Sequence, residues 1–253
     1  MSKVKKLILG HGINLRTNKP ALKNQVHIFL RIWRNYSHHD FGIERLIRLF
    51  LASIQFLTPS LYLKHFASNL GTTGRKILIE FYVLSKMLLP FLALVFGLFD
   101  SFWILVLVIM FLFETVIYVT SLIFISDASR ESVQPRRSLA LLFVNFFEII
   151  FDFAFIYIYF DTTQGGFFTK ELNDGTSAIY FSFVTAATVG YGDIAPAIPL
   201  AKRLVIVQIS LTFVFVGLFF NYFSNLLHKA QDIDTDQKFK KTRHRAKKST
   251  SPD

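Results

Sequence analysis

Residues 187–193 read ATVGYGD, a short polar and glycine-rich stretch between two strongly apolar segments. A hard monovalent cation that leaves water needs oxygen ligands in place of its hydration shell. Backbone carbonyls supply such oxygens without adding full negative charge. Gly190 and Gly192 permit the unusual backbone angles that would line several carbonyls along one axis, and Thr188 can add its hydroxyl. The side chains of Val189 and Tyr191 would then point away from this axis and brace the stretch from behind.

A helix must hold this stretch in place. Residues 176–187 are mostly small or aromatic, which predicts a short helix, and Asp174 is placed to cap its start. The helix is too short to cross a bilayer, so the chain must dip into the membrane and return. Non-helical backbone at that depth is tolerated only where it lines water or is buried in protein. The negative end of the helix dipole would face the path of the cation.

The composition places most of the chain in a membrane. Of the 253 residues, 52% are hydrophobic and 30 are phenylalanine, and the mean hydropathy is +0.43. The sequence therefore predicts an all-α membrane protein with four transmembrane helices, one re-entrant helix and N-terminal helices in the membrane interface. The absence of cysteine excludes a disulfide framework and thiolate metal sites. Four stretches reach the spanning length of about 20 residues: 77–99, 102–126, 138–160 and 200–227.

The placement of the basic residues predicts the orientation of these spans. The formal charge is +11; thirteen Lys and Arg residues precede residue 77, and eight follow His228. The connection 127–138 is also basic, whereas the segments on the opposite side carry little positive charge. The positive-inside rule then places both termini and this connection in the cytoplasm. Because the basic residues flank membrane spans, they indicate contact with anionic lipid headgroups rather than nucleic acid.

The pattern of charge and hydropathy divides the chain into four parts. A basic arm covers 1–27, and an amphipathic pattern follows over 26–63. Its second half nearly reaches spanning length but contains Arg48, Gln55 and Pro59, which favours helices that lie in the cytoplasmic interface. The parts are a basic arm with interfacial helices, a helical hairpin, a two-helix module with the glycine-rich stretch, and a basic tail: 1–76, 77–126, 138–227 and 228–253.

The segment TAATVGYGD resembles the signature of potassium channels, and the resemblance covers the whole module 138–227. It implies four chains around one axis, as a homotetramer or a mixed tetramer, with potassium as the permeant ion and no other cofactor. It also implies that oxygens of Thr188, Val189, Gly190 and Tyr191 coordinate potassium, that Gly192 completes the filter, and that Asp193 stands at its extracellular mouth. Three residues depart from common family patterns and concern the stability of the filter: Phe181, Val184 and Ala187.

The last span carries a stripe of small and polar residues at helical spacing. Ser210, Val214, Gly217, Asn221 and Asn225 fall near one face. Lipid would penalise such a stripe, whereas a water-filled pore would accept it. We interpret the stripe as pore-lining; the alternative is a seam of small residues that packs against another helix.

Charged residues inside the other spans need partners, because isolated charges are costly in a bilayer. Lys86 and Glu114 lie at similar distances from the turn of the hairpin, which predicts an ion pair between them. Glu148 and Asp152 are one helical turn apart in the third span and share a face. We expect them to pack against the hairpin or against a neighbouring subunit, while a functional role remains the alternative.

These observations favour a potassium-selective channel that conducts passively, in the cell membrane, with several spans per chain. The hairpin 77–126 lacks the regularly spaced arginines of a voltage sensor, so a standard voltage sensor is not expected. The alternative is a regulatory or non-conducting subunit of a hetero-oligomeric potassium channel or transporter. An enzyme is not expected, because no set of nucleophile and base is evident.

Overall fold

The structure of the chain is a computed structural model that describes residues 20–34, 42–125 and 135–249. All regular elements in these ranges are helices, and one isolated bridge joins Phe168 to Pro196. The predicted all-α class is thus confirmed. In chain order the elements are α2 (Ala21–Arg34), α3 (Gly42–Ile54), η1 (Gln55–Leu57), α4 (Pro59–Phe66), η2 (Ala67–Leu70), α5 (Gly71–Val95), α6 (Phe102–Phe124), α7 (Pro135–Gln164), α8 (Gly175–Ala186) and α9 (Pro199–Ser249).

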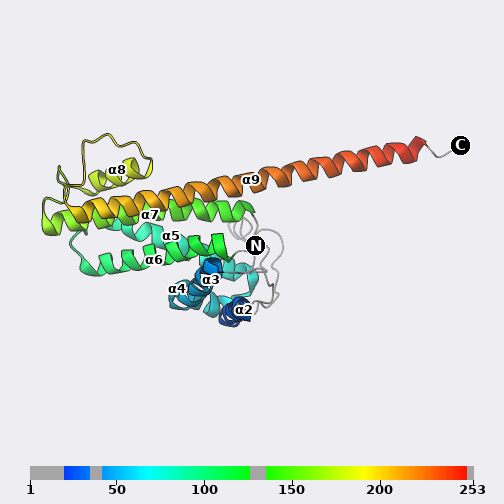
Figure 1. Ribbon diagram of the computed structural model, residues 1–253, viewed down its shortest axis with the longest axis horizontal. Coiled ribbons are helices and arrows are strands. Elements are labelled where there is room, and N and C mark those ends of the chain that lie inside the picture. Colours follow the sequence, from blue (N-terminus) through cyan, green and yellow to red (C-terminus); the bar gives the residue numbers. More distant parts are fainter. Residues whose placement is uncertain (1–19, 35–41, 126–134, 250–253) are drawn as a thin grey trace, which may run out of the picture.

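Four of these helices are long and apolar enough to cross a membrane, as the sequence predicts. The candidate spans are Ile77–Val95, Phe102–Phe124, Ser138–Gln164 and Pro199–Ser224. The last helix does not end with its candidate span at Ser224, since α9 continues without a break to Ser249. The segment predicted as a separate tail therefore begins as an extension of the last span (Figure 1).

Helix α7 is the centre of the fold. It packs against α5, α6, α8 and α9, whereas α5 and α6 contact each other much less. Within the most apolar part of each span, 56% of the residues of α7 are buried, against 22% in α5 and 39% in α6. Figure 1 shows α9 running alongside α7, with α8 at one end of the bundle and α2, α3 and α4 at the other.

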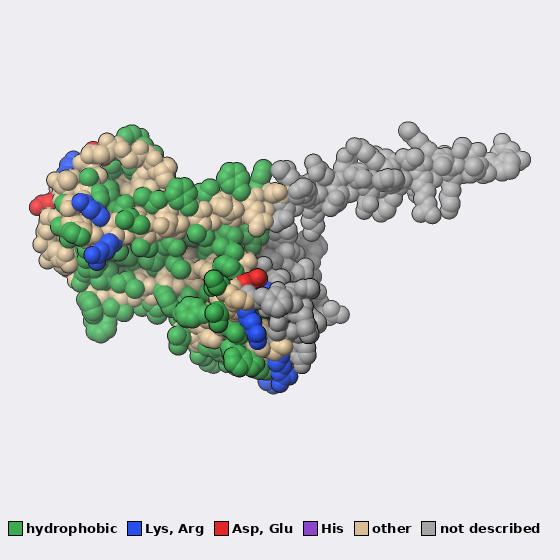
Figure 2. Space-filling view, in the orientation of Figure 1, with side chains coloured by type: hydrophobic (Ala, Val, Ile, Leu, Met, Phe, Trp, Pro, Cys, Tyr) green, Lys and Arg blue, Asp and Glu red, His purple; other side chains and the backbone are tan. Residues whose placement is uncertain are grey.

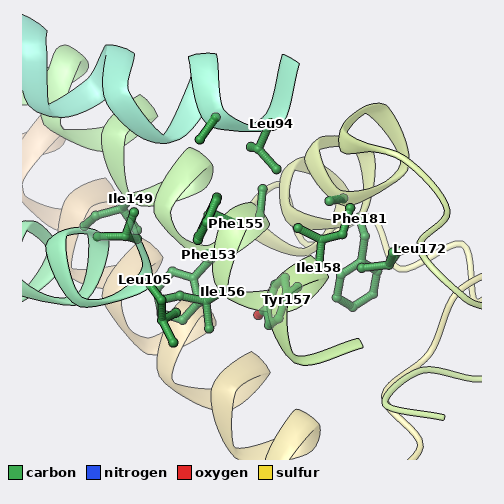
Figure 3. Packing of buried hydrophobic residues seen from close by; sticks show 14 of the residues in the cluster. Leu94, Leu105, Ile149, Phe153, Phe155, Ile156, Tyr157, Ile158, Leu172 and Phe181 are labelled. Carbon is green, nitrogen blue, oxygen red and sulfur yellow. The ribbon is translucent and has the colours of Figure 1, made fainter. Parts of the chain in front are cut away.

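The main core forms where α5 to α9 meet. Leu94 of α5, Leu105 of α6 and Phe153, Phe155 and Tyr157 of α7 belong to one cluster of buried side chains. Figure 3 shows that this cluster also reaches α8 and the loop before it, through the labelled Phe181 and Leu172. The core therefore ties the short helix directly to the long spans.

The hairpin of α5 and α6 turns over residues 96–101. Gly97 adopts a left-handed φ of +70°, which glycine accepts without a Cβ clash. The side chain of Ser101 then caps α6 by accepting a hydrogen bond from the backbone N–H of Ile104 at 3.5 Å. The hairpin therefore turns between the first two predicted spans.

The N-terminal helices form a small unit at one end of the bundle. Helix α2 begins at Ala21, five residues before the amphipathic pattern was expected to start, so the basic arm is shorter than predicted. Ile28, Ile32 and Leu51 form a second small core, and Gln25 donates to the carbonyl of Ala52 at 3.0 Å. The helical segments Gly42–Leu57 and Pro59–Phe66 meet at a 65° bend.

The surface agrees with a chain embedded in lipid. Figure 2 shows hydrophobic side chains over most of the bundle, while blue Lys and Arg side chains gather towards its two ends. The exposed side chains of Trp33, Leu46 and Phe50 continue this apolar surface onto the N-terminal helices. Placement of these helices in the membrane interface stays a prediction.

Candidate functional site

Helix α8 begins as the sequence predicts. The side chain of Asp174 accepts a hydrogen bond from the backbone N–H of Ser177 at 2.6 Å and caps the helix. This hydrogen bond also holds the pKa of Asp174 below its usual value. Asp174 is exposed. Its cap therefore fixes where α8 starts and places no charge in the protein interior.

The next residue brings α8 against the hairpin. A Cβ atom added to Gly175 would lie 2.9 Å from the carbonyl carbon of Leu94 and closer still to its oxygen. No flexible side chain could move aside there, because both atoms belong to the backbone of α5. Only glycine allows this approach, so the position of α8 depends on a direct backbone contact with α5.

A buried polar cluster fixes the other side of α8. The hydroxyl of Tyr157 on α7 donates to Oε1 of Gln208 on α9 at 2.7 Å. Nε2 of Gln208 donates to the carbonyl and the hydroxyl oxygen of Ser182 on α8, at 3.0 and 2.8 Å. Ser182 in turn donates to the carbonyl of Ile150 at 2.7 Å. Three helices therefore share one fully paired cluster, which the sequence analysis missed because Gln208 lies off the predicted stripe.

The glycine-rich stretch follows α8 directly. Its first two amides still bond to the last turn of the helix: Thr188 N–H to the carbonyl of Thr185, and Val189 N–H to that of Val184, both at 3.0 Å. Beyond them the chain leaves the helix. All seven residues from 187 to 193 are exposed in the single chain. This stretch is therefore available to water, ions or another copy of the chain.

The backbone of this stretch alternates in handedness. Thr188, Gly190 and Gly192 have left-handed φ values of +53°, +61° and +80°, whereas the residues between them do not. Alternation of left- and right-handed residues turns successive N–H groups to one side of a ribbon, and hence the carbonyls to the other. For Thr188, a residue with a side chain, such a φ is uncommon and carries strain. The unusual backbone angles expected at Gly190 and Gly192 are therefore found, and Thr188 shares them without having been predicted to do so.

Tyr180 braces the outer end of the stretch. Its hydroxyl donates to Oδ2 of Asp193 at 3.0 Å, and its ring stacks on that of Tyr191 with centroids 6.5 Å apart. Phe181, one of the three residues that depart from common family patterns, has no hydrogen-bond donor in its side chain. Phe181 in fact lies in the core, 6% exposed, and the neighbouring tyrosine supplies the donor.

The loops on either side of the stretch are held together. Asp161 at the end of α7 accepts from the backbone N–H groups of Phe168 and Leu172, at 3.3 and 2.7 Å. Thr169 N–H donates to the carbonyl of Ala195 at 2.8 Å, and Ala195 N–H donates back to the hydroxyl of Thr169 at 3.0 Å. The segment after the glycines is therefore anchored to the loop that precedes α8.

The predicted stripe of α9 faces away from the protein interior. Ser210, Val214, Gly217 and Asn221 are exposed, whereas the opposite face of the helix is buried against α7 and α8 through Gln208, Thr212, Phe215 and Leu218. The side chain of Asn225 lies outside the described residues. The arrangement fits both a pore lining and a seam against another chain, because either would use this exposed face.

The predicted ion pair between Lys86 and Glu114 is wrong. Nζ of Lys86 instead pairs with Oε1 of Glu148 at 2.9 Å and donates to the hydroxyl of Thr115 at 2.7 Å. Lys86 and Glu148 are 3% and 0% exposed. The pair joins α5 to α7 rather than α5 to α6, since both hairpin helices pack on α7. The expectation that Glu148 packs against the hairpin is confirmed.

Glu114 has different partners. Its Oε2 accepts from the hydroxyl of Tyr82 at 2.7 Å, and its Oε1 accepts from the backbone N–H of Ser60 at 3.2 Å. The second bond reaches the first turn of α4, so Glu114 connects the hairpin to the N-terminal helices. The partner here is a backbone N–H group, which every residue except proline has. The sequence alone therefore could not indicate which residue would bond to Glu114.

Comparisons with known proteins address the same region. Residues 139–229 match a family model described as an ion channel. Over 96 residues the chain is 35% identical to two-pore potassium channel 4 of Arabidopsis thaliana, a match that covers 36% of this chain and 34% of the plant protein. The chain therefore corresponds to about a third of that relative's length. No solved structure matches the chain significantly.

These comparisons support an ion-channel domain where the sequence places the two-helix module, at 138–227, and a relationship with potassium channels. The family model covers most of α7, all of α8 and the whole candidate span of α9. It does not include the hairpin or the N-terminal helices.

Proposed function

We propose that the chain is a subunit of a potassium-selective channel in which four copies surround one central pore. The observation that carries this proposal is the alternating left-handed backbone at Thr188, Gly190 and Gly192, placed at the end of a short, firmly held helix. In the proposed assembly the oxygens of residues 188–191 replace the hydration shell of potassium, Gly192 completes the filter, and Asp193 stands at the outer mouth.

The need for several copies follows from the exposure of the filter residues. One ribbon offers oxygens on a single side and cannot enclose an ion. Four ribbons around an axis form successive rings of carbonyls and cover the surfaces that are exposed in one chain. The exposed side chains of Val189 and Tyr191, at 50% and 70%, would be covered in the same step. The channel is therefore proposed as a homotetramer, with a mixed tetramer as the variant.

The surroundings of the filter suit a cation. The C-terminal end of α8 points its partial negative charge at the filter. Below the filter, the proposed cavity is lined by the exposed face of α9, with Ser210, Gly217 and Asn221 in contact with water. No cofactor other than the permeant ion is required by this mechanism.

The rest of the molecule sets the membrane context of the proposal. The channel would lie in the cell membrane with both termini in the cytoplasm, where the basic residues meet anionic lipid. Helices α5 and α6 contain Lys86 as their only basic residue between Ile77 and Phe124, so no regular array of gating charges is present in them. Conduction is therefore proposed to depend little on voltage.

Flux measurements test this function. The purified chain is placed in liposomes loaded with potassium, and the flux of potassium is compared with that of sodium. Potassium flux far above sodium flux is expected from this chain alone. Equal fluxes would refute the selective filter. Absence of flux, together with assembly on a second conducting subunit, would favour the regulatory alternative.

Two matched variants sharpen the test. Gly190→Ala and Gly97→Ala each place a Cβ on a left-handed residue with open space around it, at a similar backbone cost of roughly 1–2 kcal/mol. Only the first lies in the proposed filter. We expect Gly190→Ala to abolish selective flux and Gly97→Ala to preserve it. Equal loss in both variants would trace the effect to general destabilisation.

A further inference from the structure

We propose that Asp152 is an intramembrane proton-binding site, and that loss of its proton loosens the packing of α7 against α8. The binding site itself does not depend on the proposed channel function. Its consequence for conduction does, because α8 carries the proposed filter.

Asp152 has an unusual environment for a carboxyl group. It lies in the middle of α7, is 0% exposed, and neither of its oxygens has a hydrogen-bond partner. Glu148, one turn earlier on the same helix, is equally buried but receives Lys86 and Thr115 on one oxygen. Of these two carboxyl groups, only Asp152 is left without compensation.

The charges that face this region come from the hairpin. Helix α5 contributes Lys86 and the hydroxyl of Tyr82, and α6 contributes Glu114, which is bonded to that hydroxyl. Helix α8 contains no charged residue. In α9, the charged residues between Pro199 and Ser224 are Lys202 and Arg203, which are exposed and lie in the first turns. The titratable Tyr222 lies near the other end of this span.

The resulting balance of charge requires a proton. Three buried carboxyl groups face a single ammonium group, and that ammonium is already paired with Glu148. Glu114 is compensated by two hydrogen-bond donors, at 2.7 and 3.2 Å. An ionised Asp152 would be an isolated charge in a medium of low dielectric constant, which costs far more than a neutral carboxyl group. The proton therefore resides on Asp152.

Phe151, the residue before Asp152, connects this site to α8. Phe151 contacts Phe91 of α5, with ring centroids 5.1 Å apart, and Phe183 of α8, at 6.1 Å. If Asp152 lost its proton, the new charge would have to reach water or draw Lys86 away from Glu148. Either movement disturbs the seam in which these aromatic rings pack. The contact between α7 and α8 then weakens.

Infrared spectroscopy of the protein in bilayers tests the proton directly. A protonated carboxyl group has a carbonyl band distinct from that of a carboxylate. We expect this band at neutral pH in the wild type and in Asp100→Asn, a control at the exposed hairpin turn. The component assigned to Asp152 should be missing in Asp152→Asn. An unchanged band in Asp152→Asn would overturn the proposal.

Hydrogen exchange of the α8 amides tests the coupling. The wild type and Asp152→Asn are compared at the same pH, from neutral to alkaline, so that intrinsic exchange rates cancel. We expect α8 to exchange several-fold faster in the wild type than in the variant once the site is deprotonated. Equal exchange over the whole range, in a wild type that loses the infrared band, would refute the coupling. A chain that passes no potassium by itself would refute conduction by a homotetramer and leave both of these measurements decisive for the proton site.

Discussion

The hydrogen-bonded cluster around Gln208 allows a quantitative test of how α8 is held in place. Gln208→Met keeps the length and approximate volume of the side chain but removes its amide. Tyr157→Phe removes only the hydroxyl that bonds to this amide, at 2.7 Å. Together the two changes replace a polar contact with an apolar one. They form a double-mutant cycle on a single buried interaction.

The expected magnitudes follow from which groups lose their partners. In Gln208→Met, Ser182 keeps its bond to the carbonyl of Ile150, so the orphaned group is the hydroxyl of Tyr157, which is 0% exposed. Leaving such a group unpaired costs about 1–3 kcal/mol. Tyr157→Phe orphans Oε1 of Gln208 and should cost a similar about 1–3 kcal/mol. The double variant leaves neither group, so its cost should be close to that of one single variant.

The assay is reversible unfolding in mixed micelles, with the potassium-to-sodium flux ratio in liposomes as a second readout. A coupling energy of about 1–3 kcal/mol between the two changes would confirm the interaction. If the two costs simply added, the hydrogen bond would not contribute to stability and the reasoning would fail. The flux ratio should fall most in Gln208→Met, because the amide of Gln208 hydrogen-bonds to α8, whereas the hydroxyl removed in Tyr157→Phe bonds to Gln208 and the ring contact with α8 is kept.

Three further predictions concern other contacts of the site. Lys86→Met leaves the buried Glu148 without its counter-charge and should lower the free energy of unfolding by about 3–5 kcal/mol. Adding Glu148→Gln should restore most of this free energy, and no recovery in the double variant would contradict the pairing. Tyr180→Phe should lower the potassium-to-sodium flux ratio, since Asp193 loses its donor; an unchanged ratio would show that this bond does not support selectivity. Gly175→Ala forces a methyl group against the backbone of α5 and should destabilise the protein by about 1–3 kcal/mol in the same unfolding assay, whereas an unaffected midpoint would argue against this contact.

The four spans and the short helix α8 could be predicted because the sequence patterns that indicate them are local. A run of apolar residues predicts a spanning helix wherever its neighbours lie. Asp174 followed by small residues predicts a capped helix without knowledge of its packing. The left-handed residues were predicted at Gly190 and Gly192, where glycine marks them. At Thr188 the same geometry appears without a sequence signal, because threonine does not favour a left-handed backbone.

The partners of buried polar residues could not be predicted, because they depend on helix rotation. Counting residues from the hairpin turn placed Lys86 and Glu114 at similar depth, but depth does not determine which face points at which neighbour. Packing on α7 turns Lys86 towards Glu148. For the same reason Gln208, in the buried face of α9, escaped attention, whereas the exposed stripe beside it was noticed.

The central place of α7 has a mechanical consequence. Because α5 and α6 pack on α7 and make few contacts with each other, a lateral force from a surrounding bilayer would pass through them mainly to α7. Besides this packing, two specific contacts couple α5 to its neighbours: the ion pair of Lys86 with Glu148 on α7, and the backbone contact of Leu94 with Gly175 on α8. In the proposed channel, a change in bilayer thickness or tension would act on the filter through these helices.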